Sequence, residues 1–84
     1  MPRQIAITVR LFASLREAAG AETIAMRLPR GTPAGAVWGH LPAEVAPPMP
    51  PDGLRYAVNQ EWTVPSATLR DGDEVALILP VSGG

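Results

Sequence analysis

The last four residues of the sequence, Val-Ser-Gly-Gly at positions 81–84, are those whose types and spacing could do chemistry. No charged side chain lies between Val75 and Gly84, so the terminal carboxylate is the one charge of this segment. Glycine makes the narrowest chain, and Gly83 and Gly84 therefore leave the acyl carbon at the end unshielded. Such a segment suits a group carrier, because four extended residues reach about 14 Å into the cleft of another protein.

A resting carboxylate is a poor acyl donor, so a carrier of this kind needs a partner that first activates Gly84 with ATP. The competing interpretation is that termini fray and that small residues are common there. Two glycines alone favour that second interpretation. Their position directly after an apolar, strand-like segment favours the carrier.

Length and composition exclude most other kinds of chemistry. The 84 residues predict one domain (1–84) with a flexible C-terminal tail at 81–84. There is no cysteine and a single histidine, His40, which excludes a disulfide framework, a thiolate nucleophile, a zinc cluster and a histidine-based triad. The net charge is −1 and the arginines are scattered, so the basic stripe of a nucleic-acid-binding protein is missing.

The same sequence offers no signal peptide and no apolar run long enough for a membrane span. We therefore expect a cytoplasmic protein with no membrane or nucleic-acid partner, no metal and no bound cofactor. We also expect that it is not an enzyme on its own.

Apolar periodicity predicts the elements that must position the tail. Apolar residues at every second position from Ile5 to Leu11 predict a strand with one buried face. Residues 12–20 predict a short helix that ends at Gly20 in the left-handed conformation. Residues 22–29 predict a second strand.

The next segment predicts the main helix, over residues 33–41. Thr32 is the expected N-cap and Pro33 the expected first helical residue. One side of this helix is apolar and should pack on a sheet through Ala34, Val37, Trp38 and Leu41. The proline-rich residues 42–53 predict an extended surface loop.

Three strands and two turns complete the chain. Residues 55–64 predict two short strands that turn at Asn59-Gln60, and Asp71-Gly72 marks another turn. Residues 75–79 predict a central strand covered on both faces. The whole pattern predicts an α+β protein of the β-grasp (ubiquitin-like) class, with a mixed sheet of about five strands packed on one main helix. Its first and last strands should lie side by side at the centre.

Three segments resemble the small subunit of molybdopterin synthase, a ubiquitin-like sulfur carrier. They are VRLFASLREAAG (9–20), AVNQEW (57–62) and LRDGDEVALILPVSGG (69–84). The resemblance weakens between residues 31 and 54. The family often carries a proline pair before the tail, where this sequence has Leu79-Pro80.

The resemblance implies a mechanism and a set of partners. An E1-like adenylyltransferase would adenylate Gly84 with ATP, and a persulfide donor would convert it to a thiocarboxylate. The tail would then enter the large, catalytic subunit of molybdopterin synthase, and its sulfur would pass to cyclic pyranopterin monophosphate. A heterotetramer of two small and two large subunits is implied as well.

The resemblance also implies the site residues. Gly84 would carry the adenylate and the thiocarboxylate, and Gly83 would keep the tail thin. The contacts to partners would be made by Phe12, Trp62, Ile78, Pro80, Val81 and Ser82. Phe12 ends a strand and Trp62 follows a turn, where aromatic side chains are easily left exposed to serve as interface anchors. For Ile78, burial in the core is an equally good interpretation.

Two other functions stay open. The same carrier chemistry could serve thiamine thiazole synthesis or tRNA thiolation, although the thiazole carriers are usually shorter and lack a segment like LFASLRE. The chain could also be a noncovalent β-grasp binding module with an inert tail. Asp71 and Asp73 are explained by turn chemistry and receive no catalytic role.

Overall fold

The computed structural model describes residues 3–80. Its elements in chain order are β1 (Gln4–Arg10), α1 (Ala13–Ala19), β2 (Thr23–Pro29), the 3₁₀ turns η1 (Ala34–Ala36) and η2 (Trp38–His40), β3 (Arg55–Val58), β4 (Glu61–Thr63) and β5 (Glu74–Ile78). Within these residues no helix is long and apolar enough to cross a membrane.

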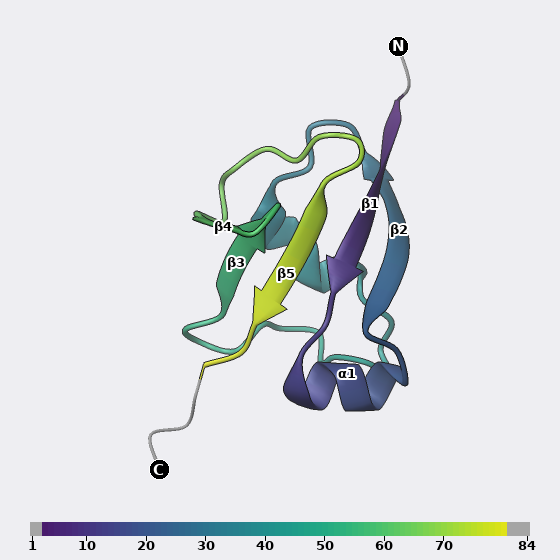
Figure 1. Cartoon of the computed structure of the whole chain (residues 1–84), viewed down its shortest axis with the longest axis vertical. Helices are drawn as coiled ribbons and strands as arrows, with labels where there is room; N and C mark the ends of the chain where they lie inside the picture. Colours follow the sequence, from purple (N-terminus) through teal and green to yellow (C-terminus); the bar gives the residue numbers. More distant parts are fainter. Residues whose placement is uncertain (1–2, 81–84) are drawn as a thin grey trace.

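The strands form a mixed sheet in the order β2-β1-β5-β3-β4 (Figure 1). β1 and β5 pair in parallel at its centre, with Val9 opposite Val75, whereas the other neighbours are antiparallel. The predicted α+β fold and the predicted pairing of the first and last strands are confirmed. The centre of the sheet therefore leads directly to Leu79 and Pro80.

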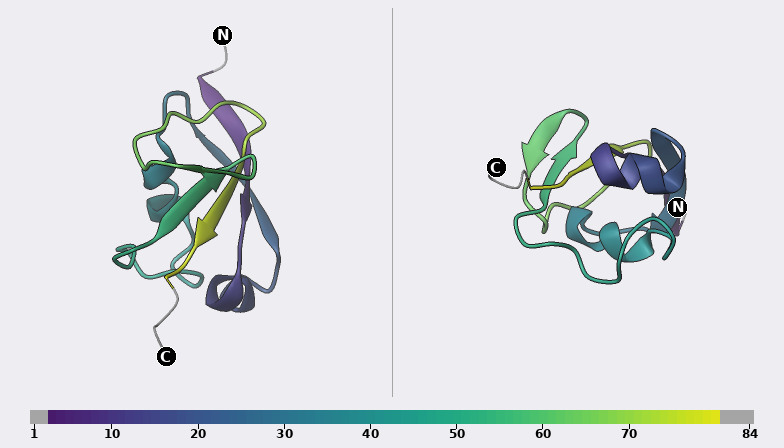
Figure 2. Two further views of the ribbon diagram at one scale, coloured as in Figure 1. Left: turned by 60° about the vertical axis from the view of Figure 1, so that its left-hand side comes forward. Right: turned by 90° about the horizontal axis from the view of Figure 1, so that it is seen from below.

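Alternation along each strand separates a buried face from an open face. In β1, Ile5, Ile7 and Val9 are buried and the residues between them are exposed. β5 follows the same rule, with Val75 and Leu77 fully buried and its other residues half-buried. The prediction that this last strand is covered on both faces is wrong, since the helical segments pack against one face only (Figure 2).

α1 follows β1 directly and lies across one end of the sheet (Figure 1). Its buried residue is Leu15. Gly20 ends it with φ 68° and donates its N–H to the carbonyl of Arg16 at 2.9 Å, which confirms the predicted left-handed end. Ala13 begins it with φ 50°, a left-handed angle that is uncommon for alanine.

The prediction of one continuous main helix over residues 33–41 is wrong. The segment makes the two successive 3₁₀ turns η1 and η2 in place of a continuous α-helix. Pro33 is extended and pairs with Thr68 in an isolated β-bridge, so it is not the first helical residue. The Thr32 hydroxyl donates to the carbonyl of Pro29 at 2.6 Å and caps no helix.

Contacts with the segment at residues 65–67 explain this difference. The N–H groups of Ala34 and Gly35 donate to the carbonyls of Ala67 and Pro65, each at 2.8 Å, so the start of η1 is satisfied by backbone far along the chain. The expected apolar side is nevertheless correct, because Ala34, Val37, Trp38 and Leu41 are all buried.

The proline-rich residues 42–53 form a surface loop, as predicted. It is tied to the core by Trp38, whose indole Nε1 donates to the carbonyl of Pro47 at 2.8 Å. Ala46, within the loop, is itself buried. The loop is therefore anchored at its middle as well as at its ends.

The predicted turns are confirmed by their backbone angles. Asn59 and Gln60 have φ of 51° and 69°, the paired positive angles of a tight hairpin turn between β3 and β4. Gly72 has φ 88°. The Asp71 carboxylate accepts the N–H of Ala6 at 2.8 Å and thereby holds this turn against β1.

Candidate functional site

The candidate site begins where β5 ends. Leu79 and Pro80 follow the central strand, and Pro80 is exposed. Val81, Ser82, Gly83 and Gly84, to which the sequence assigned the carrier chemistry and part of the partner contacts, lie outside the described residues. Strand β5 is paired on both sides, so the base of the tail starts from a firmly held part of the sheet.

The open face of the sheet lies beside this strand end. The register places Ile78 opposite Arg55, and Ala57 opposite both Ala76 and Trp62. Residues directly opposite one another on paired strands point to the same face. Trp62 and Ile78 therefore belong to one surface, separated by Arg55 and Ala57.

Trp62 is 65% exposed on the edge strand β4. The guanidinium carbon of Arg55 lies 5.2 Å from the centre of its ring, within the range of a cation–π contact. This contact limits the freedom of a large exposed ring before any partner arrives. A preoriented aromatic side chain is a favourable interface anchor.

Phe12 is 40% exposed between β1 and α1. Its backbone is extended, with φ −131° and ψ 158°, so it continues the alternation of β1 two residues after Arg10. Arg10 lies opposite Ala76 on the open face. Phe12 therefore emerges on the same face as Trp62 and Ile78.

The structure thus places Phe12 and Trp62 in solvent and Ile78 half-buried. Their contact with a partner stays a prediction. Sequence reasoning missed Arg55 and Val64, the latter 60% exposed two residues after Trp62. The alternation of β4 already indicated that Val64 shares the side of Trp62.

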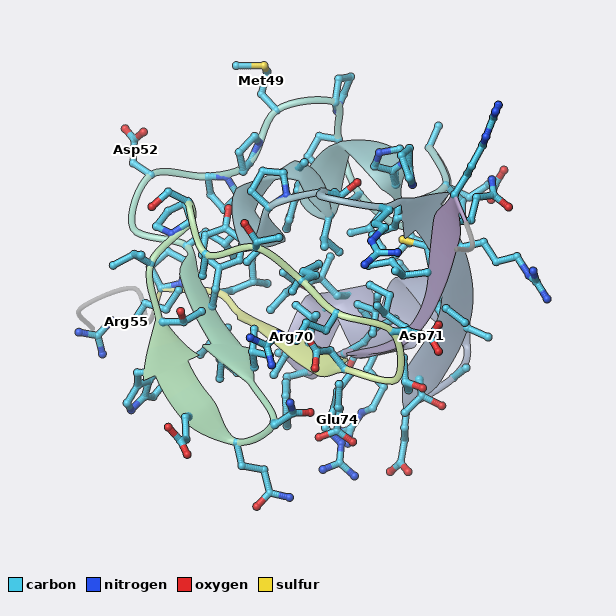
Figure 3. The ribbon with its side chains drawn as sticks, turned by 90° about the horizontal axis from the view of Figure 1, so that it is seen from above. Met49, Asp52, Arg55, Arg70, Asp71 and Glu74 are labelled. Carbon is cyan, nitrogen blue, oxygen red and sulfur yellow. The ribbon has the colours of Figure 1, made fainter. Side chains whose placement is uncertain are left out.

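The charged and polar groups around the start of β5, at the other end of the sheet from the site, serve the fold. The Asp73 carboxylate accepts the backbone N–H of Arg70 at 2.7 Å and the side-chain amide of Asn59 at 2.9 Å, which joins two turns. Arg10 and Glu74 form an exposed ion pair at 4.0 Å, of a kind that stabilises by less than about 1 kcal/mol. Figure 3 shows Arg70, Asp71 and Glu74 at the end of the sheet where β5 begins, opposite to the end at which β5 leads to Leu79.

Two further observations bear on possible chemistry. Among residues 3–80, no three histidine, cysteine, aspartate or glutamate side chains gather in a way that could hold a metal ion. Burial raises the pKa of the Tyr56 hydroxyl above its ordinary value of 10.0, and this side chain lies in the core. Neither observation places reactive chemistry within the described part of the chain.

The model of the ThiS family matches residues 9–84. A search of curated proteins finds no match.

Solved structures extend this comparison. SAMP1 from Haloferax volcanii is similar at 26% identity and a TM-score of 0.75, over 94% of this chain and 99% of that one. A candidate molybdopterin converting factor subunit 1 from Pyrococcus furiosus is 23% identical, with a TM-score of 0.74 over 92% and 99%. The ubiquitin of Caldiarchaeum subterraneum is 21% identical, with a TM-score of 0.63 over 96% and 99%. The last two likenesses concern the fold.

Proposed function

Because the chain belongs to the ThiS family of small ubiquitin-like carrier and modifier domains, we propose that it carries sulfur as a thiocarboxylate on Gly84. The client we propose is molybdopterin synthesis. In that pathway the chain is the non-catalytic subunit that donates sulfur to cyclic pyranopterin monophosphate inside the large subunit of molybdopterin synthase, in a heterotetramer.

The proposed chemistry balances in three steps. A carboxylate oxygen of Gly84 attacks the α-phosphorus of ATP on an E1-like enzyme, which forms the acyl adenylate and releases pyrophosphate. The terminal sulfur of a persulfide donor attacks the acyl carbon and displaces AMP. A second thiol then attacks the donor's inner sulfur, forms a disulfide with it and releases the tail as the thiocarboxylate.

One observation carries this proposal. The family match runs through Gly84, and the segment it ends on leaves from the central strand of the sheet through an exposed Pro80. A carrier needs a rigid folded body that a partner protein can bind and a narrow C-terminus that can enter the partner's active site. The surface for that binding is supplied by the apolar residues Phe12, Trp62 and Ile78, on the open face beside the strand end.

The molybdopterin client is supported by the sequence motifs at residues 9–20 and 69–84 and by the fold of the Pyrococcus furiosus neighbour. Thiamine thiazole synthesis and tRNA thiolation use the same carrier chemistry and are the alternative clients. Complementation separates them. Rescue of a strain that lacks the synthase small subunit supports our proposal, whereas rescue of thiamine auxotrophy alone reverses it.

A second candidate function is covalent modification of other proteins. It is favoured by the similarity to SAMP1, since a similar solved structure from the same organism is that of small archaeal modifier protein 1. This chain contains no lysine, so conjugates formed through lysine must contain a second protein. A gel of the activation reaction with cellular proteins present distinguishes conjugates from free thiocarboxylate.

Mass spectrometry of the intact protein tests the carrier chemistry. The chain is incubated with its E1-like enzyme, ATP and a persulfide donor, and we expect the mass to rise by the difference between sulfur and oxygen, located on the C-terminal peptide. Deletion of Gly83 and Gly84 should abolish the change while the fold is retained. An unchanged mass with a demonstrably active enzyme would contradict the proposal, and retained biological activity of the deletion would favour the binding module.

A further inference from the structure

β2 (Thr23–Pro29) is the outer strand on one side of the sheet, and within residues 3–80 only β1 pairs with it. In Figure 1 and in the left view of Figure 2, no other described segment runs along its outer side. Natural proteins usually shorten or interrupt edge strands, because a free edge is a template for another strand. β2 has seven residues, whereas the opposite edge strand β4 (Glu61–Thr63) has three. β2 is therefore the edge that is open to pairing.

The hydrogen bonds with β1 show which backbone groups of β2 point outward. Leu11, at the end of β1, donates its N–H to the carbonyl of Glu22 at 2.8 Å. Hydrogen-bonded positions alternate along an antiparallel pair, so every second residue after Glu22 also bonds to β1. The residues between them turn their N–H and C=O outward, and these are Thr23, Ala25 and Arg27. None of these outward groups has a hydrogen-bond partner within the described residues.

One antiparallel register of two copies satisfies all of these groups. When Ala25 lies opposite Ala25 of the second copy, Thr23 of each copy faces Arg27 of the other, and every outward N–H meets a carbonyl. A shift by two residues would set Thr23 opposite Pro29, which has no N–H to donate. A shift by one residue would place the core face of one copy beside the open face of the other. The edge therefore selects a single register with its own copy.

The side chains of β2 fit the same register. Ile24 and Met26 are half-buried at the edge of the core, and in this register each of them lies opposite the other in the second copy. Pairing removes more of their apolar surface from water, which favours association. On the open face Ala25 meets only a second methyl group, so no bulky side chain keeps the two strands apart.

The charges at the two ends of β2 favour an antiparallel second copy. Glu22 precedes the strand, whereas Arg27 and Arg30 lie at its other end. Antiparallel pairing lays the acidic end of each edge along the basic end of the other, whereas a parallel copy would bring like charges together. Arg16 of α1 faces Glu22 in an exposed ion pair at 4.0 Å, a weak contact that leaves the carboxylate open to a second cation.

We propose that two copies of this chain associate through β2, antiparallel and across a two-fold axis at Ala25, so that their sheets become continuous. Such an interface is the same patch on both copies and closes on itself. The short β4 offers no comparable second edge, so association stops at the dimer. β1 separates β2 from β5, from which the tail leaves. The dimer and the proposed carrier function are therefore independent of each other.

Disulfide cross-linking tests the register. The chain has no cysteine, so an introduced thiol reports on its own position alone. Hydrogen-bonded opposite residues have Cα atoms about 5.5 Å apart, a separation that a disulfide spans. We expect Ala25→Cys to form a covalent dimer on mild oxidation, seen on a non-reducing gel. Thr23→Cys is the matched control, since the register keeps its two thiols out of reach, and it should cross-link about ten-fold more slowly or less.

Sedimentation equilibrium tests the association itself, with the wild-type chain at concentrations up to about 1 mM. Ala25→Arg sets two like charges directly opposite each other and should raise the Kd of the dimer by about ten-fold or more. Ala43→Arg adds the same charge at an exposed position of the proline-rich loop and should leave the Kd unchanged. Ala25→Pro is a second variant, because it removes an outward N–H that β1 does not use. Circular dichroism should show that each variant retains the fold.

Three results would overturn the inference. The first is a wild-type chain that stays monomeric throughout this concentration range. The second is equal cross-linking of Ala25→Cys and Thr23→Cys, which would contradict the register. The third is a wild-type dimer that neither Ala25→Arg nor Ala25→Pro weakens, which would assign the association to another surface. Each of these results leaves the chemistry proposed for Gly84 untouched, because that chemistry is measured separately as a change of mass.

Discussion

Gly35 approaches Pro65 so closely that a Cβ on Gly35 would lie 2.8 Å from the Cβ of Pro65. Real Cβ atoms essentially never come this near to another atom, and the Gly35 N–H also donates to the Pro65 carbonyl. Glycine is therefore required here by packing. The contact joins the 3₁₀ turns to the segment that leads to the last strand.

The first prediction concerns this contact. Gly35→Ala should lower the free energy of unfolding by about 1–3 kcal/mol, because the added methyl group forces the two segments apart. Gly39→Ala is the control, since a Cβ at Gly39 would meet nothing within 4 Å. It should be neutral or stabilise by up to about 1 kcal/mol. Urea denaturation of both variants measures the difference, and equal effects would contradict the packing argument.

The same contact shows what the sequence could not predict. Gly35 lies in the segment for which the sequence predicts a helix, and its partner Pro65 is thirty positions away, so no local pattern connects the two. The extended angle of Pro33 has the same origin, since its bridge partner Thr68 lies thirty-five positions away. Long-range backbone contacts overrode a good local helix start.

The sequence predicts correctly those features that depend on neighbouring residues alone. The left-handed ends at Gly20 and Gly72 and the turn at Asn59 follow from the residue types alone. The alternation of apolar and polar residues also distinguishes the buried face of β1 from its open face. Continued to Phe12, it places this side chain on the open face, near the candidate site. The path of the proline-rich loop over residues 42–53 could not be predicted, because a proline-rich sequence indicates a loop without indicating where it runs.

A second prediction concerns the start of α1. Ala13 has φ 50°, a left-handed angle that costs alanine roughly 1 kcal/mol and glycine almost nothing. Ala13→Gly should therefore be neutral or raise the free energy of unfolding by up to about 1 kcal/mol. Ala18→Gly, inside the same helix, should lower it by about 1 kcal/mol. Thermal unfolding of the pair measures this, and a comparable loss in both variants would show that Ala13 is not strained.

A third prediction uses Tyr56, the one tyrosine of the chain. Burial raises the pKa of its hydroxyl, so the phenolate absorbance of the folded protein should appear at a pH above the ordinary value of 10.0. The unfolded chain ionises first. Stability from this group is therefore complete below the ordinary pKa and is lost as the pH rises through the higher pKa of the folded state.

One property of the sequence makes this titration clean. The sequence has no lysine, so few other side chains change charge in that range. Tyr56→Phe should abolish the absorbance change and flatten the alkaline loss of stability. A midpoint at or below the ordinary tyrosine value in the folded protein would contradict the effect of burial.

The last prediction concerns the open face. Trp62 is exposed and Arg55 lies over its ring, so Trp62→Ala should change the free energy of unfolding by less than about 1 kcal/mol. If it anchors the large subunit of molybdopterin synthase, as we propose, the same variant should weaken that complex by about 2 kcal/mol or more, roughly thirty-fold in Kd. Val64→Ala, a smaller exposed apolar loss on the same side of β4, is the control and should weaken the complex far less. Titration calorimetry with the large subunit measures both, and an unchanged affinity for Trp62→Ala would remove the open face from the interface while leaving the chemistry of Gly84 untouched.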